Sequence, residues 1–456
     1  LRARLPRRSG RYDAEMNTQD TLNAALATAR QNYIDKRPAS LATFEQATRY
    51  MPGGNTRTVL FYEPFPLRAA RGDGAMLTDL DGHRYLNLLG EYTAGLFGHT
   101  HPRIRAALEQ ALDDGVNLGA HNIYEPQLAE LVCARFPSIE RVRFTNSGTE
   151  ANLMAIASAR VHTGRDKVLV FEGGYHGGVL YFVHGGIPIN VPFPYLLGEY
   201  NASDATRTLI RRNADTLACV LVEPLLGAAG CVPADTEFLA MLREETARAG
   251  AMLIFDEVMT SRLAPGGAQE LLDITPDITT LGKYVGGGMS FGAFGGSRSI
   301  MKLYDPRRPE ALPHAGTFNN NTLTMAAGCA AMRDVYTPAA ATQLNERGDR
   351  FRAQLNQLAR SRGLPVQFTG RGSLMNLHTV PGPIRSLRDL RDENDAVKEL
   401  LFLDLLDAGY YLARRGFIAL SLVVDDASLQ QFADSFAERL DTRGALLAGA
   451  RYGPSP

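Results

Sequence analysis

The stretch Ala251-Met-Leu-Ile-Phe-Asp-Glu-Val-Met-Thr-Ser-Arg262 decides the fold, because five apolar residues in it run directly into two carboxylates. An apolar run of this length, bounded by polar residues, is typical of a strand that is buried on both faces. The next segment, Thr279-Thr-Leu-Gly-Lys-Tyr-Val-Gly-Gly-Gly288, ends a second apolar run in a single lysine in front of three glycines. We therefore expect an acid, Asp256, and a lysine, Lys283, at the ends of two strands.

The residues on either side of these segments alternate between short apolar runs and segments with helical spacing. This alternation predicts an α/β fold with a mostly parallel sheet between layers of helices, and a functional site at the carboxyl ends of the strands. The predicted strands are Val142–Thr145, Val168–Phe171, Ala218–Glu223, Met252–Asp256 and Ile278–Leu281, and the predicted helices include Glu150–His162 and Thr236–Ala249.

Changes in composition and in the pattern of predicted elements also indicate how the chain is divided into domains. Residues 1–11 hold five arginines and no acid, and Pro6 and Gly10 would break a helix there, so a disordered leader without function is expected. After Gly370-Arg-Gly372 the strands and helices become shorter and mixed, which indicates a second, smaller α+β domain. The predicted parts are a leader (1–16), an N-terminal segment that contributes to the small domain and the active site (17–75), a large domain (76–336) and a C-terminal small domain (337–456).

Composition narrows the class of protein. The chain has 456 residues, 45% hydrophobic and 21% charged, close to the average of soluble globular proteins. A formal net charge of -1 gives no overall field that would attract nucleic acid or an anionic membrane. No apolar segment approaches the roughly 18 residues of a membrane span. Four widely spaced cysteines without a CxxC pair predict reduced thiols and a cytoplasmic protein: Cys133, Cys219, Cys231 and Cys329.

Asp256 needs a cationic partner, because an unpaired carboxylate at the end of a buried strand would be costly. The N–H of a protonated pyridine ring would form a charge-assisted bond worth about 1.5–3 kcal/mol. An Asp-Glu pair after a strand also occurs at the magnesium sites of NTPases, but these require a GxxxxGK[ST] loop. Around Lys283 the sequence has Asp277 and Tyr284 where that loop needs a glycine and a hydroxyl, which excludes an NTPase.

Lys283 lies in a neighbourhood of low charge. A desolvated lysine has a lowered pKa and becomes a competent Schiff-base amine, although most lysines are surface residues without such a role. An acid at one strand end and a lysine after the next suit a carbonyl cofactor with a protonated ring nitrogen. The pair therefore predicts pyridoxal phosphate chemistry.

Two loops add candidate cofactor contacts. In Arg143-Phe-Thr-Asn-Ser-Gly-Thr-Glu-Ala-Asn152, Ser147 and Glu150 form a capping-box pattern, which opens many helices that bind nothing. The same helix start would also suit a phosphate, because its free N–H groups and dipole favour an anion. In Phe171-Glu-Gly-Gly-Tyr-His-Gly-Gly178 the glycines predict a flexible, exposed loop, from which Tyr175 could stack on a flat ring. A surface turn without function is the alternative for this loop.

Two other patterns point to different chemistry. Gly288-Met-Ser-Phe-Gly292 matches the G-x-S-x-G elbow of serine hydrolases, with His314 and His378 downstream. The elbow requires a strand before the serine and a helix after it, whereas here glycines precede it and Phe291–Gly296 reads as a strand. We therefore disfavour a hydrolase, and we expect His99-Thr-His101 to be a loop feature and not a metal site.

Taken together, six motifs resemble the class III, fold-type I aminotransferases, which depend on pyridoxal 5'-phosphate. The resemblance runs in the same order from about Arg49 to Leu440. It implies a fold-type I transferase with a large cofactor-binding domain and a smaller α+β domain, assembled as a homodimer with active sites at the subunit interface. The motifs are Asn146-Ser-Gly-Thr-Glu-Ala151, Gly174-Tyr-His-Gly177, Val222-Glu-Pro224, Phe255-Asp-Glu-Val-Met-Thr260, Thr280-Leu-Gly-Lys283 and Gly316-Thr317.

The resemblance implies a role for each matching residue. Lys283 would be the Schiff-base lysine, which later moves a proton as general base and acid, and Asp256 would pair with the pyridine nitrogen. Glu223 would not touch the cofactor itself but would contact the residues that do. The remaining cofactor contacts would be Tyr175 and Val258 on the two faces of the ring, Ser147, Gly148 and Thr149 at the phosphate, and Thr317, which is expected to reach the phosphate in the partner subunit.

Within this class the chain looks more like the β-phenylalanine aminotransferases than the glutamate-1-semialdehyde 2,1-aminomutases. That branch implies transfer of the amino group of a β-amino acid, such as (S)-β-phenylalanine, to 2-oxoglutarate with ping-pong kinetics. The segments that carry this closer resemblance are Asn55-Thr-Arg-Thr-Val-Leu-Phe61, Ser261-Arg262, Met289-Ser-Phe291, Phe318-Asn-Asn-Asn321 and Arg415-Gly-Phe417.

In that branch Arg57 and Arg415 would bind substrate carboxylates, because a guanidinium binds carboxylate through two parallel bonds. A mobile Arg415 would let one pocket accept an aromatic ring or a second carboxylate. Arg414 is adjacent, so the sequence leaves open which of the two serves, and surface arginines are the alternative. The 2,1-aminomutase, which needs no external keto acid, remains an alternative function. A non-catalytic cofactor-binding scaffold is disfavoured because Lys283 and Asp256 are both present.

Overall fold

The computed structural model describes residues 9–449 of the chain, and the side chains of residues 19–449. Strand β10 (Met252–Asp256), buried along its whole length, lies at the centre of a seven-stranded sheet. β12 runs antiparallel to both of its neighbours and the other six strands share one direction. In spatial order the strands are β4 (Arg141–Thr145), β12 (Gly292–Gly296), β11 (Ile278–Gly282), β10, β7 (Leu217–Val222), β5 (Lys167–Phe171) and β6 (Tyr195–Gly198).

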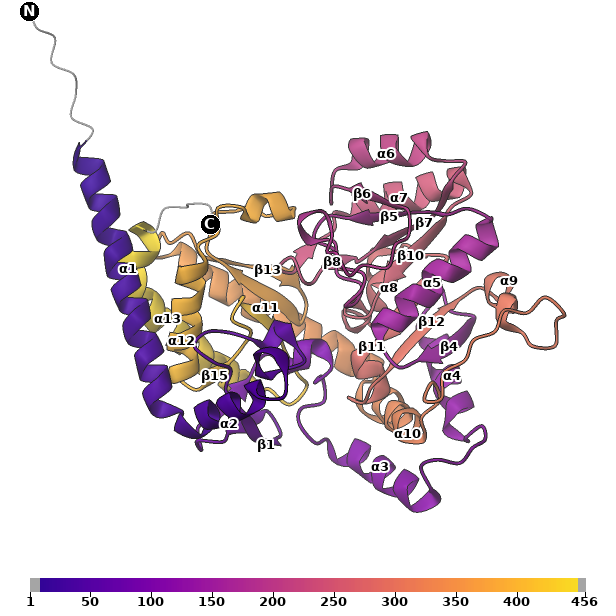
Figure 1. Ribbon diagram of the computed structural model, residues 1–456, viewed down its shortest axis with the longest axis horizontal. Helices are drawn as coiled ribbons and strands as arrows, with labels where there is room; N and C mark the ends of the chain where they lie inside the picture. The colour runs from indigo at the N-terminus through magenta and orange to yellow at the C-terminus, as the bar shows by residue number, and fades with distance from the viewer. Residues whose placement is uncertain (1–8, 450–456) are drawn as a thin grey trace, which may run out of the picture.

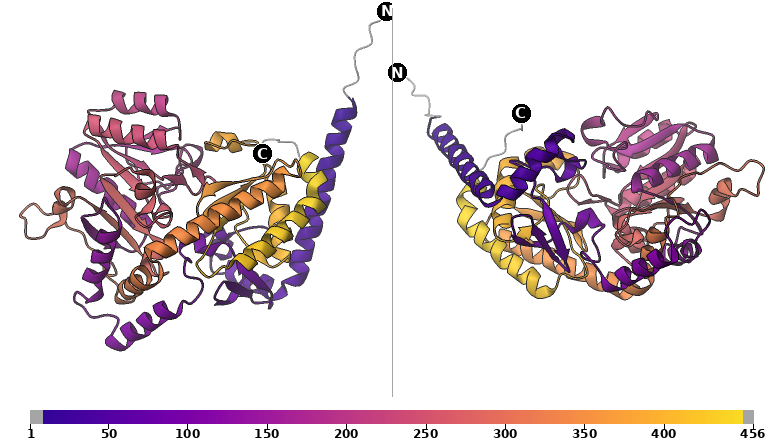
Figure 2. Two further views of the ribbon diagram at one scale, coloured as in Figure 1. Left: turned by 180° about the vertical axis from the view of Figure 1, so that it is seen from behind. Right: turned by 60° about the horizontal axis from the view of Figure 1, so that its bottom comes forward.

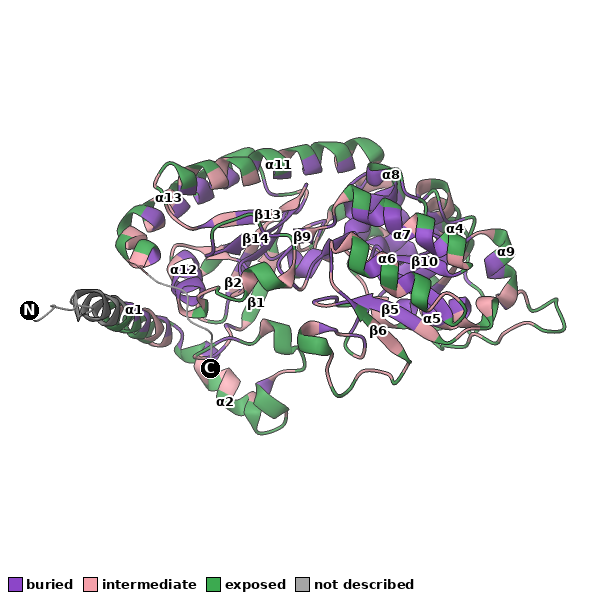
Figure 3. Ribbon diagram, turned by 90° about the horizontal axis from the view of Figure 1, so that it is seen from above, coloured by how far each residue is buried: buried purple, intermediate pink, exposed green. Residues whose placement is uncertain are grey.

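Helices cover both faces of this sheet. Successive residues of β10 point to opposite faces, so each set of side chains meets a different helix. Met252 and Ile254 pack with α5 (Gly148–Thr163), and Leu253 and Phe255 pack with α7 (Thr236–Ala249). Figure 3 shows the strands buried and the outer faces of the helices exposed. The predicted α/β fold class, with a mostly parallel sheet between helices, is confirmed.

The same part of the molecule contains further short elements (Figure 1). They are α3 (Pro102–Asp114), α4 (Tyr124–Arg135), α6 (Ser203–Arg212), α8 (Gly267–Leu272), α9 (Arg298–Met301), α10 (Thr322–Ala330), and a two-stranded ribbon of β8 (Leu225–Leu226) and β9 (Val232–Pro233). α10 continues into one π-helical turn, Ala331–Val335.

The second part of the molecule is built from both ends of the chain. One sheet joins β1 (Ala69–Asp73), β2 (Met76–Asp79) and β3 (Arg84–Asn87) to β15 (Tyr410–Tyr411), and another joins β13 (Gln367–Arg371), β14 (Leu374–His378) and β16 (Phe417–Ala419). The predicted boundary at residue 76 therefore falls inside a sheet. The helices of this part are α1 (Ser9–Lys36), α2 (Pro38–Thr48), α11 (Pro338–Arg360), α12 (Asp395–Asp407) and α13 (Asp426–Gly449).

Helix α1 begins earlier than the sequence predicts. Residues 1–8 of the predicted leader lie outside the described residues, whereas residues 9–16 are helical. Gly10 falls in the first turn, where the N–H groups have no intrahelical partner in any case, so it does not interrupt the helix. α1 runs along α12 and α13 (Figure 2), which ties the N-terminal segment to the C-terminal domain.

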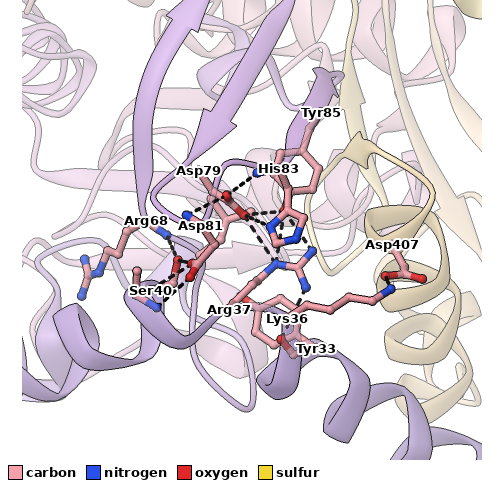
Figure 4. Close-up of polar contacts among 12 residues, drawn as sticks. Tyr33, Lys36, Arg37, Ser40, Arg68, Asp79, Asp81, His83, Tyr85 and Asp407 are labelled. Atoms are coloured by element: carbon pink, nitrogen blue, oxygen red, sulfur yellow. Dashed lines mark hydrogen bonds and ion pairs between the residues drawn. The ribbon is translucent and has the colours of Figure 1, made fainter.

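A buried polar cluster fastens α1 to the four-stranded sheet (Figure 4). Arg37 Nη2 donates to the Tyr85 hydroxyl at 2.9 Å, and that hydroxyl donates to Asp79 Oδ2 at 2.6 Å. The Arg37 guanidinium also lies 4.3 Å from the centroid of the Tyr33 ring. Because Arg37 and Asp79 are both buried, removal of either would leave an unpaired charge in the interior.

None of the helices in the described part of the chain is long and apolar enough to cross a membrane. The four cysteines are free thiols, and three of them are buried. Burial raises the pKa of the Cys219 and Cys231 thiols to about 12, so these two are protonated and unreactive at neutral pH.

Candidate active site

Lys283 and Asp256 meet at the carboxyl end of the large sheet. β10 and β11 are parallel neighbours in which Asp256 pairs with Thr280, and Lys283 is the first residue after β11. Lys283 has a positive φ of 54°, a conformation rarely adopted by residues other than glycine. Within residues 19–449, no side chain or backbone group is hydrogen bonded to its amine. Burial lowers the pKa of this amine to about 8, although the carboxylates of Asp256 and Glu223 oppose the shift.

The Asp256 carboxylate is held by three donors in a site where it is only 4% exposed. Asn152 Nδ2 and His176 Nδ1 each lie 2.8 Å from Oδ2, and the Val258 N–H donates to Oδ1 at 3.0 Å. A carboxylate offers about four acceptor positions, so one remains for a further N–H. The site thus fits a pyridinium nitrogen, which is the partner that the resemblance implies.

A second layer orients these donors. Asn152 Nδ2 also donates to the backbone oxygen of His176 at 2.9 Å, and its Oδ1 accepts from the Thr280 hydroxyl at 2.7 Å. His176 is only 2% exposed, so the expectation of an exposed histidine on a flexible loop is wrong. The reason is that Asp256 binds the ring of His176 and Asn152 binds its backbone oxygen, which holds this residue in the interior. The sequence motifs contained both Asn152 and His176, but the order of the strands was needed to join them.

Glu223 lies at the end of the neighbouring strand β7 and is 4% exposed. Its carboxylate accepts from the N–H of Tyr175 at 2.8 Å and from the N–H of Gly227 at 3.1 Å. Burial raises the pKa of Glu223 to about 7, with His176 lowering it and Asp256 raising it. Glu223 thereby fixes the loop that carries Tyr175, whose ring is 44% exposed and meets Tyr181 edge-on at 5.2 Å.

Ser147, Gly148 and Thr149 form the start of α5, next to the site. The Ser147 hydroxyl accepts from the N–H of Glu150 at 3.2 Å, while the Glu150 carboxylate accepts from the N–H of Asn146 at 2.8 Å. The capping box is thus only partly formed, because the Glu150 carboxylate binds the N–H of Asn146 and not the N–H of Ser147. The first turn of a helix leaves N–H groups free for an anion, so a phosphate fits here.

Close packing requires glycine on both sides of this helix start. A Cβ on Gly148 would lie 2.8 Å from Val258 Cγ2, and a Cβ on Gly177 would lie 2.2 Å from the Thr149 hydroxyl. Larger residues would therefore force Val258 or Thr149 out of place. The fold brings Val258, Thr149 and the Tyr175 loop close to one another.

Thr317 lies in an exposed loop and has no hydrogen bond to any other residue in the described part of the chain. Its neighbour Asn319 accepts from Asn146 Nδ2 at 3.0 Å, which holds the loop beside the start of α5. Phe318 is also exposed. The loop thus exposes Thr317 and Phe318 to solvent.

The two predicted substrate arginines lie in different settings. Arg57 Nη1 donates to Glu91 Oε1, and both side chains are about half exposed. Arg415 pairs with no carboxylate among the described side chains. Its guanidinium lies over the rings of Tyr92 and Phe417, at 5.4 and 5.2 Å, and Nη1 donates to the backbone oxygens of Gly227 and Ala228 at 3.1 and 2.6 Å.

The structure separates Arg415 from its neighbour Arg414. Arg414 Nη2 forms an ion pair with Glu399 at 2.9 Å, and Glu399 also binds Arg30 of helix α1. Arg415 is close enough to Lys283 to lower the pKa of its amine further. Arg414 thus belongs to the packing of the small domain, whereas Arg415 lies against two aromatic rings and the backbone that follows β8.

The hydrolase and metal patterns find no support. Ser290, the serine of the G-x-S-x-G pattern, precedes strand β12 and not a helix. Neither His314 nor His378 is hydrogen bonded to it among the described residues. His314 accepts from Arg143 Nε at 2.9 Å, and His378 contacts Glu393 at 3.1 Å. In the part of the chain that the structure describes, no cluster of histidine, cysteine or acidic residues could hold a metal ion.

Comparisons with known proteins agree with this geometry. The family model described as "Aminotransferase class-III" matches residues 61–440. A beta-phenylalanine transaminase from Variovorax paradoxus is 52% identical over 433 residues, which cover 95% of this chain and all of the relative. A solved β-phenylalanine aminotransferase from the same species superposes with a TM-score of 0.93 at 51% identity, over 95% of this chain and 100% of that one.

A more distant relative bears on the alternative function. A glutamate-1-semialdehyde 2,1-aminomutase from Opitutus terrae is 37% identical, over 87% of this chain and 98% of its own length. A solved transaminase with PLP bound is 32% identical with a TM-score of 0.82, over 90% of this chain and 98% of that one. The cofactor of that structure is the one that the site of this chain fits.

Proposed function

The chain belongs to the class III aminotransferases, a family of pyridoxal phosphate enzymes, and on that basis we propose that it transfers the amino group of a β-amino acid such as (S)-β-phenylalanine to 2-oxoglutarate. The reaction would proceed in two halves with ping-pong kinetics. The similarity to a beta-phenylalanine transaminase over nearly the whole chain supports this choice of donor.

Pyridoxal phosphate, when bound, supplies the electron sink that stabilises a carbanion next to the amino group. The residues of this chain then have separable tasks in the proposal. Asp256, held by Asn152 and His176, accepts the ring N–H and keeps the ring protonated. Lys283 binds the cofactor through its amine and, once that amine is freed by the substrate, moves a proton to and from the reacting carbon. A pKa of about 8 suits both directions of transfer near neutral pH.

The other predicted contacts complete the cofactor site in this proposal. Tyr175 and Val258 enclose the ring, and Ser147, Gly148 and Thr149 bind the phosphate at the start of α5. Support comes from the close packing of Val258 against Gly148 and of Thr149 against Gly177.

The observation that carries the choice of substrate is the position of Arg415. Its guanidinium lies on two aromatic rings and donates to two backbone oxygens, and no carboxylate among the described side chains pairs with it. Such a side chain can bind the distal carboxylate of 2-oxoglutarate or give way to the ring of β-phenylalanine. Arg57 then binds the carboxylate that donor and acceptor share.

The proposed enzyme is a homodimer in the cytoplasm, with each active site completed by Thr317 of the partner. Support comes from the exposure of Thr317 and from four large apolar side chains that face solvent, one in α3 and three in the segments that precede α4 and α10. These are Leu112, Leu118, Ile123 and Phe318. Burial of such residues is what an interface between subunits provides.

A coupled assay tests the proposal against the mutase. Purified holoenzyme is supplied with β-phenylalanine and 2-oxoglutarate, and glutamate is measured. A parallel reaction supplies glutamate-1-semialdehyde alone and measures δ-aminolevulinate. We expect glutamate from the first reaction and no product from the second. The reverse result would establish the 2,1-aminomutase instead.

A further inference from the structure

Arg57, the arginine assigned to the shared carboxylate, already has a carboxylate partner. It pairs with Glu91, and no other acid pairs with it among the side chains of residues 19–449. The two side chains are 45% and 55% exposed. An exposed ion pair adds little to the stability of a fold, because each charge is well solvated alone. A second carboxylate that arrives from solution can therefore take the place of Glu91.

The backbone around Glu91 is unusual. Gly90, Glu91, Tyr92 and Thr93 have φ angles of 54°, 50°, 49° and 85°, so four consecutive residues adopt the left-handed conformation. Residues with a Cβ rarely adopt it, and a β-branched residue such as Thr93 does so least often. Strain of this kind persists only where the surrounding structure enforces it, and it is concentrated at sites that bind ligands.

Packing and hydrogen bonds enforce this conformation. A Cβ on Gly90 would lie 2.7 Å from the backbone oxygen of Ala419, which leaves room only for glycine. The Tyr92 hydroxyl donates to the backbone oxygen of Val59 at 2.9 Å. Because Val59 is two residues from Arg57, the same bond fixes the acid relative to the arginine.

The residue after Glu91 contacts the second arginine. The ring of Tyr92 stacks on Phe417 at a centroid distance of 5.4 Å and an interplanar angle of 28°. The guanidinium of Arg415 lies over both rings. The strained segment thus offers a carboxylate to Arg57 and an aromatic surface to Arg415, which are the two kinds of group found in the proposed substrates.

We propose that Glu91 is a specificity-determining residue: its carboxylate occupies Arg57 in the ligand-free protein, and the carboxylate of a substrate binds by displacing it. This inference rests on the proposed function, since it takes Arg57 as the substrate's carboxylate ligand. The displaced side chain remains in solvent, because its backbone is fixed and it is exposed. Every carboxylate substrate then competes with Glu91, whereas an amine without a carboxylate has no means of displacing it.

The test uses the holoenzyme with Glu91→Gln, which keeps the shape of the side chain and removes its charge. We expect KM for β-phenylalanine and for 2-oxoglutarate to fall about three- to tenfold, with kcat changed by less than about twofold. Glutarate, a dicarboxylate that cannot react, should bind tighter by a similar factor when titrated against the cofactor absorbance. Glu91→Gly, which suits the left-handed backbone, should act in the same direction and guards against misfolding of the first variant.

Two controls separate competition from a general charge effect. Glu45→Gln removes an exposed acid on α2, away from the arginine, and should leave glutarate binding unchanged. In an Arg57→Ala background, Glu91→Gln should have no further effect on glutarate binding, because the guanidinium for which Glu91 and glutarate compete is gone. An equal gain in that background, or no tightening of glutarate in the otherwise unaltered protein, would overturn the proposal. The glutarate titration does not depend on turnover, so a protein that fails to use β-phenylalanine would refute the proposed function without deciding the role of Glu91.

Discussion

The two ends of the site that we propose, one for the cofactor and one for the substrate carboxylate, are held in opposite ways. At the cofactor end, Asp256 is buried and bonded to three donors, two of which are themselves fixed by further hydrogen bonds. At the carboxylate end, Arg57 is half exposed and pairs with one acid, and Arg415 rests on aromatic rings and backbone oxygens. The first arrangement is buried and held by several hydrogen bonds, whereas the second is the one that, in our proposal, is exchanged for a ligand.

The difference follows from what each end binds. A cofactor remains through many turnovers, so its partners gain from being fixed in advance. In the proposed reaction, donor and acceptor alternate in the same place, so the groups that bind them would have to release one carboxylate and accept the next. Substitutions at the two ends should accordingly separate loss of chemistry from loss of affinity.

Lys283→Ala should have the largest effect. It removes both the amine that binds the cofactor and the proton carrier, and proton transfer alone contributes about 10²–10⁴-fold in rate. We expect turnover to fall by at least this factor and the absorbance band near the edge of the visible range to disappear. Lys302→Ala, at an exposed lysine, is the matched control and should keep both. A normal absorbance band in Lys283→Ala would remove this residue from the cofactor site.

Arg57→Ala should act on affinity alone. Loss of a charge-assisted bond of about 1.5–3 kcal/mol corresponds to a rise in KM of roughly 10- to 100-fold for donor and acceptor. The cofactor absorbance should be intact, because Asp256 and Lys283 are untouched. Arg57→Lys keeps the charge but not the planar fork, so an intermediate KM is expected. Unchanged kinetics in Arg57→Ala would contradict the assignment.

Arg415→Ala and Arg414→Ala form a pair of adjacent substitutions with different expected results. Removal of Arg415 should raise KM for 2-oxoglutarate about tenfold and change KM for β-phenylalanine by less than about threefold, since only the acceptor carries a second carboxylate. Removal of Arg414 leaves the buried Glu399 paired with Arg30 and should leave both KM values within about twofold. The opposite pattern would exchange the two roles.

Glu223→Gln should alter the pH dependence of stability in the cofactor-free protein. The pKa of Glu223 is about 7 in the folded state, above the ordinary carboxyl value, so the folded state binds the proton more tightly than the unfolded state. Its contribution is favourable at low pH and is lost as the pH rises from about 4.5 to 7. Each pKa unit corresponds to about 1.4 kcal/mol, so Tm should fall by a few degrees over this range. The fall should be smaller in Glu223→Gln, and identical profiles would refute the assignment.

The strand that carries Asp256 was predicted correctly for a physical reason. An apolar run has to be buried, so the bounds of β10 were predicted to the residue, and the acid that ends it needs a partner. The network behind Asp256 was not predicted, because His176, Asn152 and Thr280 come from separate elements whose neighbours depend on strand order. Strand β12 inserts antiparallel between β4 and β11, which its glycine-rich sequence does not reveal.

The exchangeable end could be predicted only in part. Arg57 and Arg415 were identified by resemblance, but the partner of Arg57 was not, because nothing in Gly90-Glu-Tyr-Thr93 signals a left-handed backbone at three residues other than glycine. The contacts of β16 and of the Val59 loop impose that conformation. β6 and β13 were missed as well, and the predicted boundary at residue 76 separated β1 from β2 and β3 of the same sheet, because pairing between distant segments leaves little trace in local sequence.

The most direct test of a rigid cofactor end joined to an exchangeable carboxylate end is the absorbance spectrum of the holoenzyme during sequential additions. β-Phenylalanine alone, without any keto acid, should abolish the band near the visible edge, and 2-oxoglutarate added afterwards should restore it. The two changes would show that donor and acceptor use the same site in turn. No spectral change with β-phenylalanine, or a change that 2-oxoglutarate fails to reverse, would contradict the account.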